Sequence, residues 1–371
     1  MVTDAIGLYV HIPFCKSKCR YCDFCSSVAS LEEYERYTER LISEIRAYKR
    51  EPRIAVGTVF FGGGTPSVLP LELIRPIFDA IRETFTIFPG AEITVEANPG
   101  TLTEEQILAY RELGVNRMSI GMQSVHENEL KILGRIHTFE DARRAVDMIR
   151  GAGFINFNID LMYGIPEQTL SSFEKTLDEV IAMEPSHVSC YGLILEEGTP
   201  LYRMKDSLDL PSEEEEYGMY ELAISRLGEA GYSHYEISNY ERDGFYSFHN
   251  LRYWHDEEYI GVGLSAHSYF GGKRYYSPER MSEYLSGDGV QYLIEDECPD
   301  RPFEYVMMRM RLSEGISLSE YEALFGEPFT KGREEKLSQY EEAGFVRRDG
   351  DRLAFTDKGM YVSNTLLSRL L

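Results

Sequence analysis

Residues 9–25 read YVHIPFCKSKCRYCDFC, a short apolar run that leads straight into four cysteines. Cys15, Cys19 and Cys22 have the spacing C-x3-C-x2-C. Thiolates are soft ligands that suit iron–sulfur clusters, zinc and copper(I). A compact loop of this kind can aim three sulfurs at one point. The spacing suits a 4Fe–4S cluster in which one iron has no protein ligand and is open to a substrate or cofactor.

Two simpler interpretations apply to the same loop. Closed structural zinc sites have four ligands, usually as paired C-x2-C units, and Cys25 would be the fourth ligand here. Alternatively, the cysteines are ordinary buried thiols. The rest of the chain has to decide between a cluster, a zinc loop and a plain core.

The composition narrows the class of protein. With 371 residues, 43% of them hydrophobic, the chain is long enough for one large domain and a small one. We expect no transmembrane segment and no secretory signal, because no long apolar run and no basic leader are present. Six cysteines, four of them bunched, do not resemble a disulfide framework, so we expect a cytoplasmic location. The net charge of −24 argues against binding to nucleic acid.

Strand-like and helix-like segments alternate about six times through the first 240 residues. The expected strands are 7–12, 58–61, 92–97, 117–122, 157–162, 187–193 and 233–240, and the expected helices are 31–50, 69–85, 103–113, 139–149, 171–183 and 214–227. Such alternation predicts parallel strands with right-handed crossovers. Six units are too few to close an eight-stranded barrel, so the predicted fold is α/β, a partial (β/α)6 TIM-like barrel. A doubly wound open sheet is the alternative.

The character of the chain changes near residue 300. Three helices are expected at 302–312, 317–325 and 333–343, followed by a hairpin around Asp349-Gly350-Asp351 and a last helix over 356–370 with Thr356 as N-cap. We therefore expect the partial barrel in residues 1–240, a connecting segment in 241–300 and a small C-terminal winged-helix-like domain in 301–371. Acidic and basic residues are nearly balanced in that last part, which favours a packing or lid role over DNA binding.

Polar residues and glycines gather where the predicted strands end, which is the functional rim of a β/α barrel. Gly62-Gly63-Gly64-Thr65 would either let a ligand approach the bare backbone or form a tight turn. The remaining rim residues are each at or just beyond a strand end and together suggest a ligand with amine, carboxylate and ribose groups: Glu96, Gln123, Arg135 and Asp160.

Together these motifs resemble the radical S-adenosylmethionine superfamily, and more narrowly its oxygen-independent coproporphyrinogen III oxidase branch. The branch resemblance also includes 9–15, His234-Tyr-Glu-Ile-Ser-Asn239 and Gly261-x-Gly-x-x-Ala-His267. The resemblance implies that Cys15, Cys19 and Cys22 ligate a 4Fe–4S cluster whose fourth iron binds S-adenosylmethionine. It further implies contacts to that cofactor from Gly63, Gly64, Thr65, Glu96, Gln123, Arg135 and Asp160, with Asp160 near the ribose and with Tyr9 and Tyr21 against the cofactor.

Two departures from the oxidases are informative. The oxidases carry a fourth cysteine two residues after the third, where this chain has Phe24, and Cys25 is displaced by one. They also have a sizeable extension before the cluster strand, whereas this chain reaches Cys15 almost at once. Both features resemble instead the HemW group of heme chaperones.

The stretch His249-Asn-Leu-Arg-Tyr-Trp254 resembles the H-N-x-x-Y-W motif linked to heme in that group. His249 would be an axial iron ligand, and Tyr253 and Trp254 would stack on the macrocycle. The structural alternative is that His249 caps a turn and Trp254 fills the core. His267 and His11 are rival heme ligands.

We therefore expect a heme chaperone that binds a 4Fe–4S cluster, S-adenosylmethionine and heme. Its expected partners are a tetrapyrrole, an apo-hemoprotein recipient and a small electron-donor protein. The alternative is an oxygen-independent coproporphyrinogen III dehydrogenase, in which a 5′-deoxyadenosyl radical drives oxidative decarboxylation, and whether the protein is an enzyme is left open. A third class, a binding module stabilised by zinc or a cluster, would lack radical chemistry.

Overall fold

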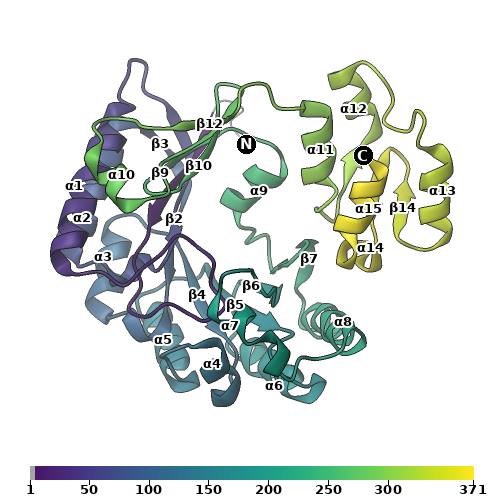
Figure 1. The fold of residues 1–371 in the computed structure, drawn as a ribbon, viewed down its shortest axis with the longest axis horizontal. Helices are drawn as coiled ribbons and strands as arrows, with labels where there is room; N and C mark the ends of the chain where they lie inside the picture. The colour runs from purple at the N-terminus through teal and green to yellow at the C-terminus, as the bar shows by residue number, and fades with distance from the viewer. Residues whose placement is uncertain (1–4) are drawn as a thin grey trace.

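A sheet of 12 strands forms the larger part of the molecule in this computed structural model, which describes residues 5–371 (Figure 1). Its centre consists of six strands in sequence order, each parallel to the next: β1 (Ile6–Ile12), β2 (Ala55–Gly63), β3 (Thr86–Ala97), β4 (Arg117–Gln123), β5 (Phe157–Tyr163) and β6 (His187–Gly192). A doubly wound sheet reverses its strand order partway, and this one does not. The predicted partial (β/α)6 barrel is therefore confirmed.

Helices cover the outer face of the strands and close the crossovers (Figure 1). They are α1 (Leu31–Ala47), α2 (Leu71–Thr84), α3 (Glu104–Glu112), α4 (Glu127–Leu133), α5 (Phe139–Gly151), α6 (Leu170–Ala182), α7 (Pro200–Arg203) and α8 (Glu213–Glu229), with short 3-10 turns at Pro66–Val68, Pro99–Thr101 and Lys205–Ser207. Side-chain oxygens satisfy the free amides at several helix starts. Ser30 and Glu33 form a capping box on α1, and Ser212 and Glu215 form one on α8.

The sheet extends beyond the barrel at both ends. At one end β9 (Tyr259–Val262) pairs parallel with β1, and β10 (His267–Phe270), β11 (Lys273–Tyr276) and β12 (Leu293–Asp296) continue it in antiparallel fashion. Residues 241–300, expected only to connect, thus add four strands to the main sheet, together with α9 (Phe248–Trp254) and α10 (Met281–Ser286).

At the other end the expectation of one strand over 233–240 is wrong. The segment is two short antiparallel strands, β7 (Ser233–Glu236) and β8 (Asn239–Glu241), and β8 lies against β6. The reversal falls at Ile237 and Ser238, without the glycine or proline that usually marks a turn. The Ile237 amide donates to the Arg311 carbonyl at 3.0 Å, so a contact from the far end of the chain satisfies this turn.

The C-terminal part has its own core around Val306, Leu337 and Leu353. It comprises α11 (Arg301–Arg309), β13 (Ile316–Ser317), α12 (Leu318–Phe325), α13 (Glu334–Glu342), β14 (Val346–Asp349), β15 (Arg352–Phe355), α14 (Asp357–Tyr361) and α15 (Ser363–Leu370). The predicted hairpin is confirmed, and the Thr356 side chain accepts from the Gly359 amide as N-cap. The expectation of a single last helix over 356–370 is wrong. The chain leaves helical geometry at Val362, which divides the segment into α14 and α15.

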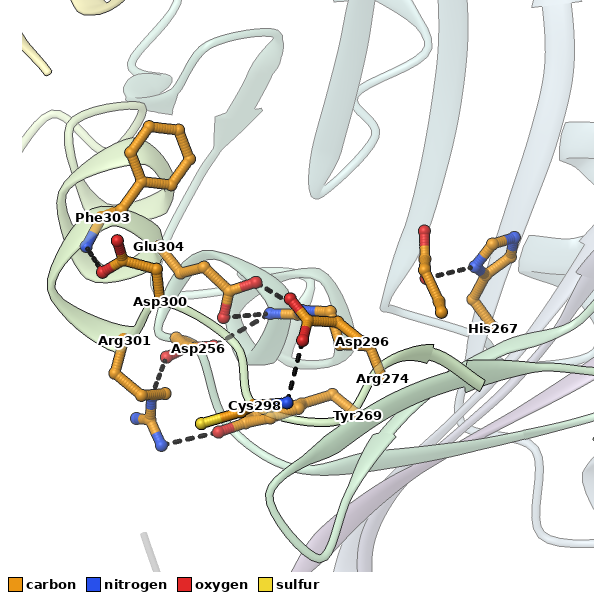
Figure 2. Close-up of polar contacts among 11 residues, drawn as sticks. Asp256, His267, Tyr269, Arg274, Asp296, Cys298, Asp300, Arg301, Phe303 and Glu304 are labelled. Carbon is orange, nitrogen blue, oxygen red and sulfur yellow. Dashed lines mark hydrogen bonds and ion pairs between the residues drawn. The ribbon is translucent and has the colours of Figure 1, made fainter. Parts of the chain in front are cut away.

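An ion network centred on the buried Asp256 links this part to the sheet edge, with Arg301 at its half-exposed side (Figure 2). The Asp256 carboxylate, 1% exposed, pairs with Arg274 at 3.1 Å and with Arg301 at 3.0 Å. Arg274 also donates to both carboxylate oxygens of Glu304, at 2.6 and 3.0 Å, and Arg301 donates to the Tyr269 hydroxyl at 2.6 Å. Because each charge has a partner, burial of this network does not leave an unpaired ion.

None of the helices between residues 5 and 371 combines the length and the apolar character that crossing a bilayer requires.

Candidate cofactor site

A cavity of about 330 Å³ lies at the carboxyl ends of the barrel strands. The predicted cluster cysteines and all but one of the predicted S-adenosylmethionine contacts line it: Cys15, Cys19, Cys22, Tyr21, Gly63, Gly64, Thr65, Glu96, Gln123, Arg135 and Asp160. These side chains come from segments up to 145 positions apart and meet because parallel strands end at one edge of the sheet.

Two loops that pack backbone to backbone form the cluster side of the cavity. The Gly64 amide donates to the Ile12 carbonyl at 2.8 Å, and a Cβ on Gly64 would lie 2.6 Å from the Phe14 carbonyl oxygen. Phe14 is fully buried, with its ring 4.5 Å from Tyr34 and 5.1 Å from Tyr37. Gly64 is therefore required by this close approach, independently of any ligand.

The three thiols face the same cavity without meeting at one point. Cys15 is buried and accepts from the Thr65 hydroxyl at 3.6 Å, and Cys19 accepts from Arg135 at 3.4 Å. Burial raises the pKa of the Cys22 thiol. Across residues 5–371 no three histidine, cysteine or acidic side chains converge as a single metal ion would require. The three sulfurs of a 4Fe–4S site ligate three different irons, so such convergence is not needed there.

Cys25 does not join this group. Its thiol donates to the Glu279 carbonyl at 3.6 Å, and its carbonyl accepts from His11 Nε2 at 2.9 Å. A zinc site would need four ligands around one ion. The geometry therefore does not support the zinc loop with Cys25 as fourth ligand.

A hydrogen-bonded layer beneath the cavity holds Asp160 in place. Asn158 donates to the Asp160 carboxylate at 2.7 Å, and Ser119 donates to it at 3.4 Å. The Asn158 side-chain oxygen in turn accepts from His187 Nδ1 at 2.7 Å, and the Tyr235 hydroxyl donates to His187 Nε2 at 2.9 Å. Burial keeps the pKa of His187 well below its ordinary value, so this ring is neutral.

The two acidic side chains of the cavity are poorly solvated. Burial raises the pKa of Glu96 to about 8, and the nearby charge of Asp160 adds to the effect. Burial also raises the pKa of Asp160. Carboxyl groups in this state favour a cationic ligand, because a positive charge restores their ionised form.

Gln123 carries two signs of a binding position. Its backbone lies in the left-handed region with φ 71°, which is costly for a residue other than glycine and commonly marks a functional site. Its side-chain oxygen is buried and, within the described part of the chain, accepts no hydrogen bond. Arg135 lies nearby and donates to the Asn98 side chain and the Gly121 carbonyl. This donor and acceptor set fits a zwitterionic nucleoside.

Tyr9 is outside the cavity lining. Its hydroxyl donates to His11 Nδ1 at 3.0 Å, and its ring stacks on Phe60 and His249 with centroids 6.3 and 6.5 Å apart. Phe24, noted in the sequence only as the place of a missing cysteine, also lines the cavity, as does Ser17 on the same loop. The other lining residues that sequence reasoning did not select lie in or directly after the barrel strands: Ala97, Asn98, Ser119, Gly121, Met162 and Tyr191.

The HNLRYW residues are not brought to this cavity. His249 is 1% exposed on α9, its Nδ1 is 2.8 Å from the Thr58 hydroxyl, and its Nε2 is 2.8 Å from the Tyr253 hydroxyl. Burial lowers its pKa to about 3. Trp254 is partly buried, with the Arg311 guanidinium 5.9 Å from its ring centre. The predicted axial ligand therefore has no open ring nitrogen in this arrangement.

A second cavity of about 260 Å³ lies beside α9. Its lining includes Thr58, Glu92, Phe248 and Arg252. The Glu92 carboxylate accepts from the backbone amides of Phe248 and His249 at 3.1 and 2.9 Å, so it anchors the start of α9.

Comparison with known proteins identifies the family to which this architecture belongs. The profile of the radical SAM superfamily matches residues 9–180, and that of the HemN C-terminal domain matches residues 298–362. The chain is similar to heme chaperone HemW of Lactococcus lactis, with 34% identity across 100% of this chain and 98% of the relative. It is also similar to heme chaperone HemW of Escherichia coli, with 34% identity over 99% and 98%, and of Bacillus subtilis, with 32% identity over 98% of each chain.

Among solved structures, the coproporphyrinogen III oxidase HemN from Escherichia coli, a radical SAM enzyme, superimposes with a TM-score of 0.85. The match covers 99% of this chain and 90% of that one at 23% identity, which shows a shared fold. The full-length similarity above 30% identity is to the heme chaperones. The chain therefore belongs to the HemW heme-chaperone family of the radical SAM superfamily.

Proposed function

We propose that this protein is a cytoplasmic heme chaperone that binds a 4Fe–4S cluster and S-adenosylmethionine, binds heme, and passes heme to apo-hemoproteins. Membership of the radical SAM superfamily implies the cluster and S-adenosylmethionine. The observation that carries the proposal is the single cavity in which three soft thiols meet the polar rim of the barrel.

In this proposal Cys15, Cys19 and Cys22 hold the cluster. A bound cluster of this kind supplies one electron to the sulfonium of S-adenosylmethionine. The chain's own part is to bind, orient and shield the cofactor. Cys15 and Cys19 already accept hydrogen bonds from Thr65 and Arg135, and these contacts hold the two sulfurs at the cavity.

The cofactor contacts divide by chemistry. Glu96 and Asp160 offer carboxylates to the cationic and hydroxyl groups of S-adenosylmethionine, Gln123 offers a free amide oxygen, and Arg135 offers a cation to a carboxylate. Gly63, Gly64, Thr65 and Tyr21 complete the lining, and Tyr9 supports it from behind.

A small electron-donor protein is part of this proposal. Lys16 and Lys18 are exposed on the cysteine loop of a chain whose net charge is −24. A local positive charge on an acidic protein favours an acidic flavin or iron–sulfur partner. Raising the ionic strength should slow reduction of the cluster by such a donor, and Lys16→Glu with Lys18→Glu should do the same at low salt. A rate of cluster reduction that is unaffected by both the ionic strength and the two lysine substitutions contradicts this docking.

The function is tested with anaerobically reconstituted protein. We expect a brown protein with about four irons per chain, one heme bound per chain, and transfer of that heme to an apo-hemoprotein. The serine variant of all three cluster cysteines is the control and should lose the iron. Incubation with coproporphyrinogen III should give no decarboxylation. Decarboxylation together with 5′-deoxyadenosine release would establish the dehydrogenase instead.

A further inference from the structure

We infer that His267 is the axial ligand that takes the heme iron, with Glu295 as its supporting carboxylate. His267 begins β10, and its side chain is 50% exposed. It is the one exposed histidine among the eight in the chain, all of which lie in the described residues. This inference rests on the proposed heme binding and names the residue that would carry it.

The ring of His267 is already oriented for metal binding. Its Nδ1 is 3.3 Å from the Glu295 carboxylate, which can only accept, so Nδ1 carries the proton in the neutral ring. The lone pair is then on Nε2, and no hydrogen bond within residues 5–371 occupies that atom. Histidines that ligate metals usually donate their other nitrogen to a carboxylate or carbonyl in this way. A proximal histidine is a common ligand of heme iron.

The surface around His267 suits a flat apolar macrocycle. His267 and Tyr276 are cross-strand partners, and their rings stack with centroids 5.2 Å apart and planes 19° from parallel. Tyr276 is in turn paired with Leu293 on β12, which is 50% exposed. Cross-strand partners lie on one face of a sheet, so a histidine, an aromatic ring and an aliphatic side chain stand side by side. Figure 2 shows His267 apart from the Asp256 ion network of the same sheet edge.

The other seven histidines are all less accessible than His267. His249 and His11 have both ring nitrogens in hydrogen bonds. His187 is fully buried and is also bonded at both nitrogens. The remaining four are buried or partly buried and each has at least one nitrogen engaged: His126, His137, His234 and His255.

His267 also lies at the same rim of the barrel as the cluster loop. Strand β9 runs parallel to its neighbour β1, so the carboxyl ends of both strands, at Val262 and Ile12, lie at the same edge of the sheet. His267 follows β9 after a short loop that packs on His11, since a Cβ on Gly263 would lie 2.7 Å from the His11 carbonyl oxygen. Heme at His267 would therefore share this rim with the proposed S-adenosylmethionine site.

The test is heme titration of the reconstituted full-length protein, followed by absorbance, with and without added imidazole. We expect His267→Gly to bind heme at least about tenfold more weakly, since losing even a supporting group costs about 10- to 100-fold in metal affinity. Imidazole should restore the wild-type heme spectrum by filling the space left by the ring. Iron content of the cluster should stay unchanged, which shows that the variant is folded.

His249→Gly is the matched comparison and His255→Ala the control. We expect neither to change the heme spectrum, whereas Glu295→Gln should weaken heme binding less than His267→Gly does. Wild-type binding by His267→Gly, or rescue by imidazole in His249→Gly alone, overturns the assignment. Failure of the wild-type protein to bind heme overturns the proposed function as well, and so the two failures are distinguishable.

Discussion

Glu96 should make S-adenosylmethionine binding depend on pH. The residue stands at the end of β3 in the cofactor cavity, where burial and the charge of Asp160 raise its pKa to about 8. Arg117 and a hydrogen bond from the Gly63 amide act in the opposite direction and are outweighed. At neutral pH this carboxyl group is therefore mostly protonated before the ligand arrives.

The sign and size of the effect follow from that pKa. The sulfonium of S-adenosylmethionine is a cation, so it favours the ionised carboxylate and binding releases a proton below about pH 8. About one in ten of these carboxyls is ionised at pH 7 and about nine in ten at pH 9, and one pH unit corresponds to about 1.4 kcal/mol. The affinity should therefore rise about tenfold from pH 7 to pH 9 and level off above that.

Equilibrium dialysis of cluster-loaded protein against S-adenosylmethionine measures this dependence. Glu96→Gln keeps the size and polarity of the side chain but removes the ionisation, so its affinity should be nearly flat across the same range. A wild-type affinity that falls with rising pH refutes the reasoning. So does an equal slope in the glutamine variant, since another group would then be titrating.

Three further predictions concern the support of the sites. Gly64→Ala should displace the cluster loop, because its Cβ would meet the Phe14 backbone, and we expect about 1–3 kcal/mol less stability and a loss of iron, measured by thermal unfolding and iron assay. Asn158→Ala removes the main hydrogen-bond donor to Asp160, so it should cost about 1–3 kcal/mol in urea unfolding and weaken S-adenosylmethionine binding. His249→Ala leaves the buried Thr58 hydroxyl and the partly buried Tyr253 hydroxyl without their partner, so it should destabilise the fold by about 1–3 kcal/mol while heme titration stays unchanged. Unaltered stability in any of the three contradicts the packing described.

The barrel could be predicted because its signals are local. Alternating strand and helix patterns allow few topologies, and parallel strands bring their carboxyl ends to one edge. For this reason Glu96, Gln123, Arg135 and Asp160 were expected together and are found together. The added strands β9 to β12 and the β7–β8 reversal were missed because their pairing depends on segments distant in the sequence.

The residues that support Asp160 from behind the cavity could not be predicted from the sequence. Asn158 and His187 belong to no motif, and the motif at 234–239 that contains Tyr235 does not reveal its partner. The three residues form a hydrogen-bonded chain behind Asp160 only because three strands bring them into contact. Likewise, the need for Gly64 comes from the Phe14 backbone, 50 positions away, and not from a turn of its own.

By itself, the amino-acid sequence determined the chemistry of the cysteine loop, the strand-end polar groups and the family resemblance that Phe24 narrowed. Only the tertiary structure decided which histidines have a free nitrogen. His249 is bonded to Thr58, 191 positions away, whereas His267 is backed by Glu295 and opens to solvent. A ring nitrogen's availability depends on the neighbours that folding brings to it, and neither motif nor spacing records those neighbours.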